Sequence, residues 1–228
     1  MKIKVFVFCV CFFSVSSVFA QNWFIGGSVV LNFSTDEVTA SDGSINSTDS
    51  RVIDISPIIG YKINRLDFGI YPIFQFQQAE SNYESGYSQN IKNFGIGTGI
   101  FSRYNFISIG NFSILGNLSV EYLYSISNSE VSYSTPQYNN DYEENSHKIS
   151  MNLKPIFEYR LSDRFSLYSN FGLGGIGGTY RHYSRNTNSS EPTGNQSRKG
   201  NSFAFDVPSV FNLKITEFSL GFFVHFGK

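Results

Sequence analysis

The side chains in this sequence that could do chemistry are few and scattered. His182, Ser184 and Asp206 supply a base, a nucleophile and an acid, which are the residue types that activated-serine chemistry requires. Their residue types match such a set, but nothing in the sequence places the three residues together. His182 is more simply interpreted as a polar surface residue. No group of His and Cys residues has the spacing of a zinc site. The sequence therefore predicts no catalytic residue, no metal and no cofactor.

A second group of ionisable residues lies within stretches in which polar and apolar residues alternate. Its members share the polar face of those stretches, and the main ones are Asp54, Arg103, Glu121, Lys154 and Glu158. An unpartnered buried ion is costly, so ions enclosed together must pair. We interpret these residues as a structural salt-bridge network, with a gated ion path as the functional alternative.

The elements that must position these residues are strands. From Trp23 onward, apolar residues recur at every second position, which is typical of strands with two different faces. Eight such segments follow one another, and they begin near Trp23, Ile53, Leu66, Asn93, Phe112, Ile149, Phe165 and Phe203. The last is irregular, and a bulge between Pro208 and Glu217 would reconcile its two halves.

The connections between the segments alternate in length. Long polar loops are expected at 36–50, 79–90, 129–146 and 184–201, and short turns at 64–65, 105–111 and 161–164. Eight segments with long connections at one end and short ones at the other predict an all-β, eight-stranded antiparallel up-and-down transmembrane β-barrel. All four long loops would then lie at the same end.

The composition excludes several other classes of protein. Of the 228 residues, 17% are aromatic and only 15% are charged, whereas about a quarter is usual for charged residues in soluble domains. A net charge of -1 excludes the broad basic surface that nucleic-acid binding requires. The mean hydropathy of -0.15 excludes a bundle of membrane-spanning helices.

The sizes of the residues on the two faces of the strands indicate which face forms the outside of the barrel. One face holds Phe, Tyr, Ile and Leu, and the other holds mainly Gly, Ser and Asn with a few ions. An eight-stranded barrel has an interior only just wide enough for side chains, so the large residues should face outward into lipid. Aromatic residues near the short turns would form a girdle at headgroup level, namely Trp23, Tyr61, Tyr104, Tyr159, Phe165 and Phe226. A soluble, ligand-binding barrel is the alternative.

The first twenty residues are predicted to be an export signal. Lys2 and Lys4 precede an apolar run, and a small-residue site ends at Ala20. Cleavage after Ala20 leaves a barrel of residues 21–228. Both cysteines, Cys9 and Cys11, lie within the signal, so the mature protein has none.

Three stretches resemble the small outer-membrane β-barrel proteins of the OmpX/OmpA type, in the form typical of Bacteroidota. They are the glycine-rich strand at 97–104, the segment 155–167 and the closing strand at 220–226. The resemblance covers the whole mature chain and implies a location in the outer membrane of a Gram-negative cell. It also implies that the C-terminal strand is recognised by the barrel-assembly machinery.

The function implied by this resemblance is structural, or one of recognition at the cell surface by the four long loops. Outer-membrane lipid and lipopolysaccharide are the expected partners, and an extracellular ligand at the loops is a further candidate. Basic residues could meet lipopolysaccharide phosphates, namely Arg181, Arg185, Arg198 and Lys199, and divalent ions could bridge on the acidic side, at Asp141, Glu143 and Glu144. The alternatives are solvated loop charge and an enzyme that modifies lipid or lipid A at the outer rim through His182 and its neighbours.

Overall fold

The computed structural model describes residues 22–39, 45–83, 87–133, 140–170, 176–189, 196–206 and 217–226. These residues form ten strands, which are β1 (Trp23–Thr39), β2 (Ile45–Ile63), β3 (Leu66–Tyr83), β4 (Tyr87–Ile109), β5 (Phe112–Tyr133), β6 (Asn140–Arg160), β7 (Phe165–Asn170), β8 (Ile176–Ser189), β9 (Gln196–Asp206) and β10 (Glu217–His225). The expected signal segment lies outside the described residues. The predicted eighth segment is wrong, because its two halves belong to different strands: Phe203 lies in β9, which pairs with β8, whereas the half from Phe218 onward lies in β10, which pairs with β1 and β7. In the part that is described, no helix is long and apolar enough to cross a membrane.

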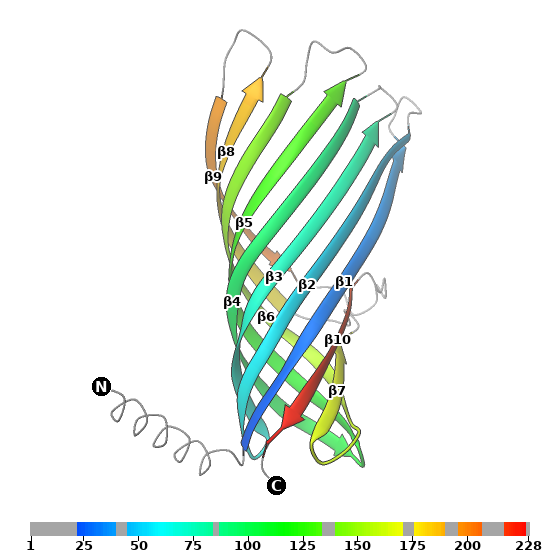
Figure 1. The fold of residues 1–228 in the computed structure, drawn as a ribbon, viewed down its shortest axis with the longest axis vertical. Coiled ribbons are helices and arrows are strands. Elements are labelled where there is room, and N and C mark those ends of the chain that lie inside the picture. The colour runs from blue at the N-terminus through cyan, green and yellow to red at the C-terminus, as the bar shows by residue number, and fades with distance from the viewer. Residues whose placement is uncertain are drawn as a thin grey trace, which may run out of the picture.

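Eight of the strands form a closed ring of antiparallel pairs. Strands β1 to β6 each pair with the next strand, β7 pairs with β10, and β10 pairs with β1. Figure 1 shows the strands inclined around a common long axis. The predicted all-β antiparallel architecture, with eight strands in the ring, is confirmed.

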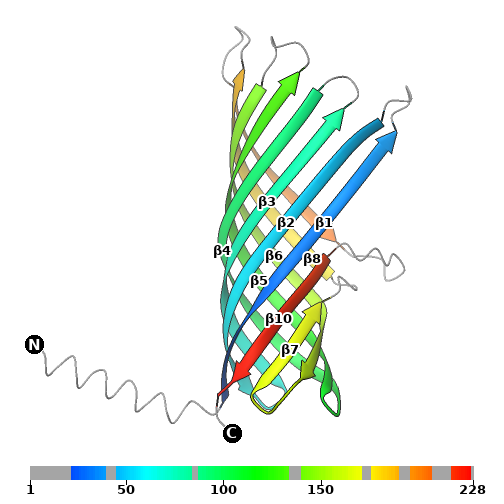
Figure 2. The ribbon, with the colours of Figure 1, turned by 45° about the vertical axis from the view of Figure 1, so that its right-hand side comes forward.

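The strands that form the wall of the ring differ between its two ends. The turn between β2 and β3 marks what we call the lower end of the ring, and the opposite end is the upper end. Near the lower end β6 pairs with β7, whereas from Asn140 to Leu153 it pairs with β8, which in turn pairs with β9. Figure 2 shows the short strand β10 beside β1 and the short strand β7 on the other side of β10. Among the described residues, β9 has a strand partner on one side only, and so does β1 beyond Asn32.

The turns at the lower end follow local backbone chemistry. Asn64, in the turn between β2 and β3, has a φ of 55°, and Gly110, between β4 and β5, has a φ of 58°. Asparagine and glycine are the residues that tolerate this left-handed conformation best. The predicted turn at 105–111 is shorter than expected, because β4 continues to Ile109 with a register shift between Asn105 and Ile107.

The predicted long loops at the upper end are wrong in their extent. Strand pairing continues to Thr39 opposite Ile45 and to Tyr83 opposite Tyr87, and β6 begins at Asn140. Most of 184–201 is likewise paired, in β8 and β9. An antiparallel ladder is made by backbone groups, so a polar sequence can continue it wherever neighbouring strands stay in register.

The two faces of the ring follow the predicted alternation. Large apolar side chains cover the outside, including Ile25, Ile59, Ile70, Ile100 and Leu220, each of them at least 44% exposed. The interior holds many buried serines, such as Ser56, Ser119, Ser146 and Ser166. The predicted orientation of the large residues is therefore confirmed.

The interior is not lined by small polar residues alone. A buried apolar cluster fills its lower part, formed by Phe24, Ile58, Phe101, Leu115, Ile156, Tyr168 and Phe223. Inward-facing glycines make the room for these rings. Phe24 lies opposite Gly60, and Tyr168 lies opposite Gly221, where a Cβ atom would be 2.1 Å from the Tyr168 ring. Each glycine lets an aromatic ring lie across the neighbouring backbone.

Candidate functional site

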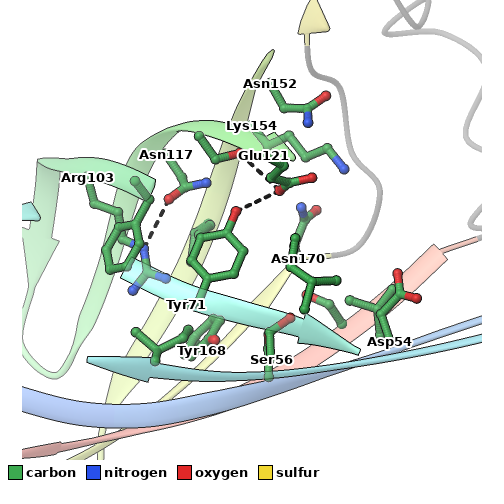
Figure 3. A pocket seen from close by; sticks show the side chains of 18 residues that line it. Asp54, Ser56, Tyr71, Arg103, Asn117, Glu121, Asn152, Lys154, Tyr168 and Asn170 are labelled. Carbon is green, nitrogen blue, oxygen red and sulfur yellow. Dashed lines mark hydrogen bonds between the residues drawn. The ribbon is translucent and has the colours of Figure 1, made fainter. Parts of the chain in front are cut away.

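The candidate site is a cavity of about 190 Å³ inside the ring, above the apolar cluster. Strands from all sides contribute to its wall, and Figure 3 shows the polar side chains that point into it. Its ionisable residues are Asp54, Arg103, Glu121 and Lys154, and its neutral polar residues include Tyr71, Asn117, Asn152 and Asn170. The apolar cluster lies below, so the polar space has a hydrophobic floor.

Glu121 is held in place by two hydroxyl groups. The Tyr71 hydroxyl donates to Glu121 Oε1 at 2.6 Å, and Ser119 Oγ donates to the same oxygen at 3.3 Å (Figure 3). Tyr71 lies opposite Gly99 in the β3–β4 ladder, and a Cβ atom at Gly99 would be 2.3 Å from the tyrosine ring. The glycine therefore allows the Tyr71 ring to reach across β4 to Glu121 on β5.

Arg103 lies at the boundary between the cavity and the apolar cluster. It is 4% exposed, and its Nε donates to Asn117 Oδ1 at 3.1 Å (Figure 3). Its guanidinium lies over the rings of Phe101, Phe223 and Tyr168, with 4.2, 4.6 and 5.0 Å from its carbon to the three centroids. A buried cation is stabilised by ring faces because they carry negative electrostatic potential.

The predicted lumen ions do not all lie in one place. Asp54, Arg103, Glu121 and Lys154 line the same cavity, whereas Glu158 is buried nearer the lower end, opposite Ser113 and Tyr168. A continuous salt-bridge network among the five remains a prediction. Near the lower end, Lys62 Nζ lies 3.8 Å from Asp67 Oδ1.

The six residues of the predicted aromatic girdle lie toward the lower ends of their strands. Trp23 begins β1, Phe165 begins β7, and Phe226 follows β10. Tyr104 and Tyr159 are 41% and 49% exposed on the outer face. Trp23 and Tyr61 contact each other edge to face, with 5.4 Å between the ring centroids. Their position at a membrane surface remains a prediction.

A second group of charges lies higher inside the ring. Glu144 is buried, and both of its carboxylate oxygens are bound by arginines of β8. Oε1 accepts from Arg181, and Oε2 lies 2.7 Å from Arg185 Nη2. The prediction that Glu144, Arg181 and Arg185 lie in charged loops is wrong, because all three are strand residues that face the interior.

The acid of the hypothetical catalytic set is not brought to the histidine and the serine, and these two lie two residues apart on the same face of β8. His182 Nδ1 lies 2.7 Å from Asn201 Oδ1 on the outer face of the wall. Asp206 is opposite Gly177, five residues along β8 from His182, which at ~3.3 Å per residue is a separation of about 17 Å. Among the described residues, no three His, Cys, Asp or Glu side chains are placed to hold a metal ion.

The fold is similar to several solved structures. They include a major outer membrane protein from Thermus thermophilus (11% identity, 90% of this chain and 99% of that one, TM-score 0.45). Neisserial surface protein A has 16% identity, with 90% and 97% covered and a TM-score of 0.37. The ferric yersiniabactin uptake receptor FyuA from Yersinia pestis has 13% identity, with 82% of this chain but 31% of that one covered, and a TM-score of 0.39. No protein-family model and no curated protein matches the sequence.

Proposed function

We propose that this chain is an integral β-barrel protein of a bacterial outer membrane, with a structural or surface-recognition role at its upper end. The observation that carries the proposal is the apolar outer face of the ring. Soluble monomers rarely expose contiguous apolar patches larger than a few hundred Å². Here isoleucine, leucine, valine and phenylalanine side chains are exposed on every side of the ring. Lipid is the solvent that suits such a surface.

The height of the apolar face supports a membrane position. On β4 the outward residues from Tyr104 to Phe94 span ten residue steps. At ~3.3 Å per residue and the strand tilt usual in such barrels, this is about 23–27 Å along the axis, close to the ~25 Å apolar band of outer-membrane barrels. Strand β4 has 23 residues, about twice the number that a spanning strand needs. Its polar upper half would therefore project beyond the membrane.

The polar inner face favours a membrane barrel over a soluble ligand-binding barrel. A soluble ligand-binding barrel would have the reverse arrangement, with an apolar pocket inside and polar residues outside. Asp206 of the hypothetical catalytic set lies apart from His182 and Ser184, which favours a structural function over an enzymatic one. Outer-membrane lipid would contact the belt, and the C-terminal strand would be the part recognised by the barrel-assembly machinery during insertion.

Cysteine labelling tests this proposal, since the sequence has no cysteine after Cys11. Ser132→Cys would place a thiol at the exposed upper end of β5, and Arg164→Cys would place one in the exposed lower turn. In intact Gram-negative cells, a membrane-impermeant maleimide should label the Ser132→Cys protein and should label the Arg164→Cys protein only after lysis. Recovery of the protein in the soluble fraction, or equal labelling of both variants in intact cells, would contradict the proposal.

A further inference from the structure

The inner wall formed by β6, β8 and β9 above the cavity carries more cations than carboxylates. Glu144 is buried on this wall, and the two arginines that bind it, Arg181 and Arg185, face the same way. Lys148 lies directly opposite Leu123, which is also buried inside, and Arg198 lies directly opposite Arg185. Directly opposite residues in an antiparallel pair point to the same face of the sheet.

Like charges are placed directly opposite one another on this wall. Lys148 pairs with Arg181 across β6 and β8, and Arg185 pairs with Arg198 across β8 and β9. Like charges in such positions are destabilising, because the Cβ atoms are only about 4.5–5.5 Å apart. Among the side chains described on this wall, Glu144 is the one carboxylate against four cations. The described part of the wall therefore has an uncompensated excess of three positive charges.

These cations can be reached from the upper opening of the ring. The side chains of Arg181 and Arg185 are 42% and 38% exposed although both bind a buried carboxylate, and Arg198 is exposed. The guanidinium group presents a planar fork of donors that matches phosphate oxygens. Lys199 lies opposite Ser184 on the other face of β9, so it belongs to the outer surface and not to this group.

We propose that Lys148, Arg181, Arg185 and Arg198 form a binding site for a phosphate-bearing ligand with at least two negative charges. Such a ligand would neutralise the excess charge and bridge β8 and β9, while Glu144 keeps Arg181 and Arg185 oriented. The same chemistry could come from a free di- or polyphosphate or from a phosphorylated lipid headgroup. The proposal deepens the surface-recognition role and depends on the proposed function only for the source of the ligand.

The test compares two double variants that lose the same charge from opposite faces. Arg185→Gln with Arg198→Gln removes two inner cations, whereas Arg51→Gln with Lys199→Gln removes two outer ones. Calorimetric titration of the folded full-length protein in detergent, with pyrophosphate at low ionic strength, should show binding. We expect affinity about a hundredfold weaker in the inner double variant and nearly unchanged in the outer one, since each of the two charge-assisted contacts removed is worth roughly one tenfold step.

A single variant keeps the test interpretable if the inner double variant does not fold. Arg198→Gln leaves both ion pairs of Glu144 in place and should still weaken binding. A second titration, with phosphatidylcholine vesicles that contain diphosphoryl lipid A, distinguishes the sources of phosphate. Stronger binding to these vesicles than to pyrophosphate indicates a lipid headgroup, and the reverse indicates a soluble phosphate.

Two results would overturn the site. One is equal affinity of the wild-type protein and the inner double variant for both probes. The other is absence of binding to either probe by wild-type protein that is folded and fractionates with the outer membrane. The second result would leave the proposed membrane function intact, because fractionation is measured independently of phosphate binding.

Discussion

At the residue scale, the most constrained side chain is Arg103. It is enclosed by three aromatic rings and interacts electrostatically with Asp67 and Glu158. Arg103→Ala would remove this cation from the buried Glu158, whereas Asp67 would keep Lys62 at 3.8 Å. We expect it to lower the free energy of unfolding by about 3–5 kcal/mol, the usual cost of leaving a buried carboxylate without a compensating cation. Urea titration of the protein in lipid vesicles measures this loss.

Arg51→Ala is the matched control for that substitution. Arg51 is exposed on the outer face of β2, and removal of an exposed charge usually changes stability by less than about 0.5 kcal/mol. Equal losses in the Arg51→Ala and Arg103→Ala proteins would show that the interior does not depend on the Arg103 charge.

The second prediction at the residue scale concerns the contact between Gly99 and the Tyr71 ring. Gly99→Ala would push the Tyr71 ring away from Glu121, and overpacking of this kind lowers the free energy of unfolding by about 1–3 kcal/mol. Gly178→Ala is the control, because its Cβ would meet one atom of Phe205, at 3.9 Å. Thermal unfolding of both variants should show a loss for the first alone. A Gly99→Ala protein as stable as the control would contradict the account of the ring over the glycine.

Part of the interior could be predicted from the sequence. Strand parity alone places Arg103, Glu121 and Lys154 on the inner face. The role of Tyr71 could not be predicted, because its contact with Gly99 depends on the register between β3 and β4. The repeated glycines at 95, 97 and 99 are the available signal, since space left on a strand must be filled by side chains from its neighbours.

At the element scale, the upper halves of the strands differ most from expectation. The Ser and Asn residues in 129–146 favour a loop when the sequence is considered alone, because they are common in turns. In the structure, polar residues of the upper strands continue the ladder and join neighbouring strands through side chains. Thr48 and Ser81 are 3.1 Å apart at their hydroxyl oxygens, and Gln89 donates to Ser129 at 3.0 Å. Cross-strand partners of this kind cannot be seen in the sequence of one strand.

Hydrogen exchange tests the paired state of these upper strands. Backbone amides of Ser129 and Val131 lie in a strand with ladder partners in β4, and Ser129 also pairs with Tyr142 of β6. We expect slower exchange in these residues than in the lower turn at 161–164, measured by mass spectrometry of the protein in vesicles. Exchange at the rate of an unstructured peptide would show that the upper ladder does not form.

At the scale of the whole molecule, two properties of the ring explain the proposed function together. The outer face is apolar over a height that matches a membrane, and the interior is filled below by rings and above by a polar cavity and a basic wall. The sequence could predict the first property because residue size and parity determine it locally. The second depends on which strands meet around the ring.

The central claim, that lipid surrounds the outer face, is tested most directly by tryptophan quenching. Trp23 is the only tryptophan, so Trp23→Phe combined with Ile100→Trp places a single indole in the middle of the belt on β4. Trp23→Phe combined with Gln78→Trp places it at an exposed outer position on the upper part of β3. In vesicles of acyl-chain-brominated phosphatidylcholine, we predict strong quenching of the indole at position 100 and weak quenching at position 78. Equal accessibility of both indoles to aqueous acrylamide, with no quenching by the brominated lipid, would contradict the claim.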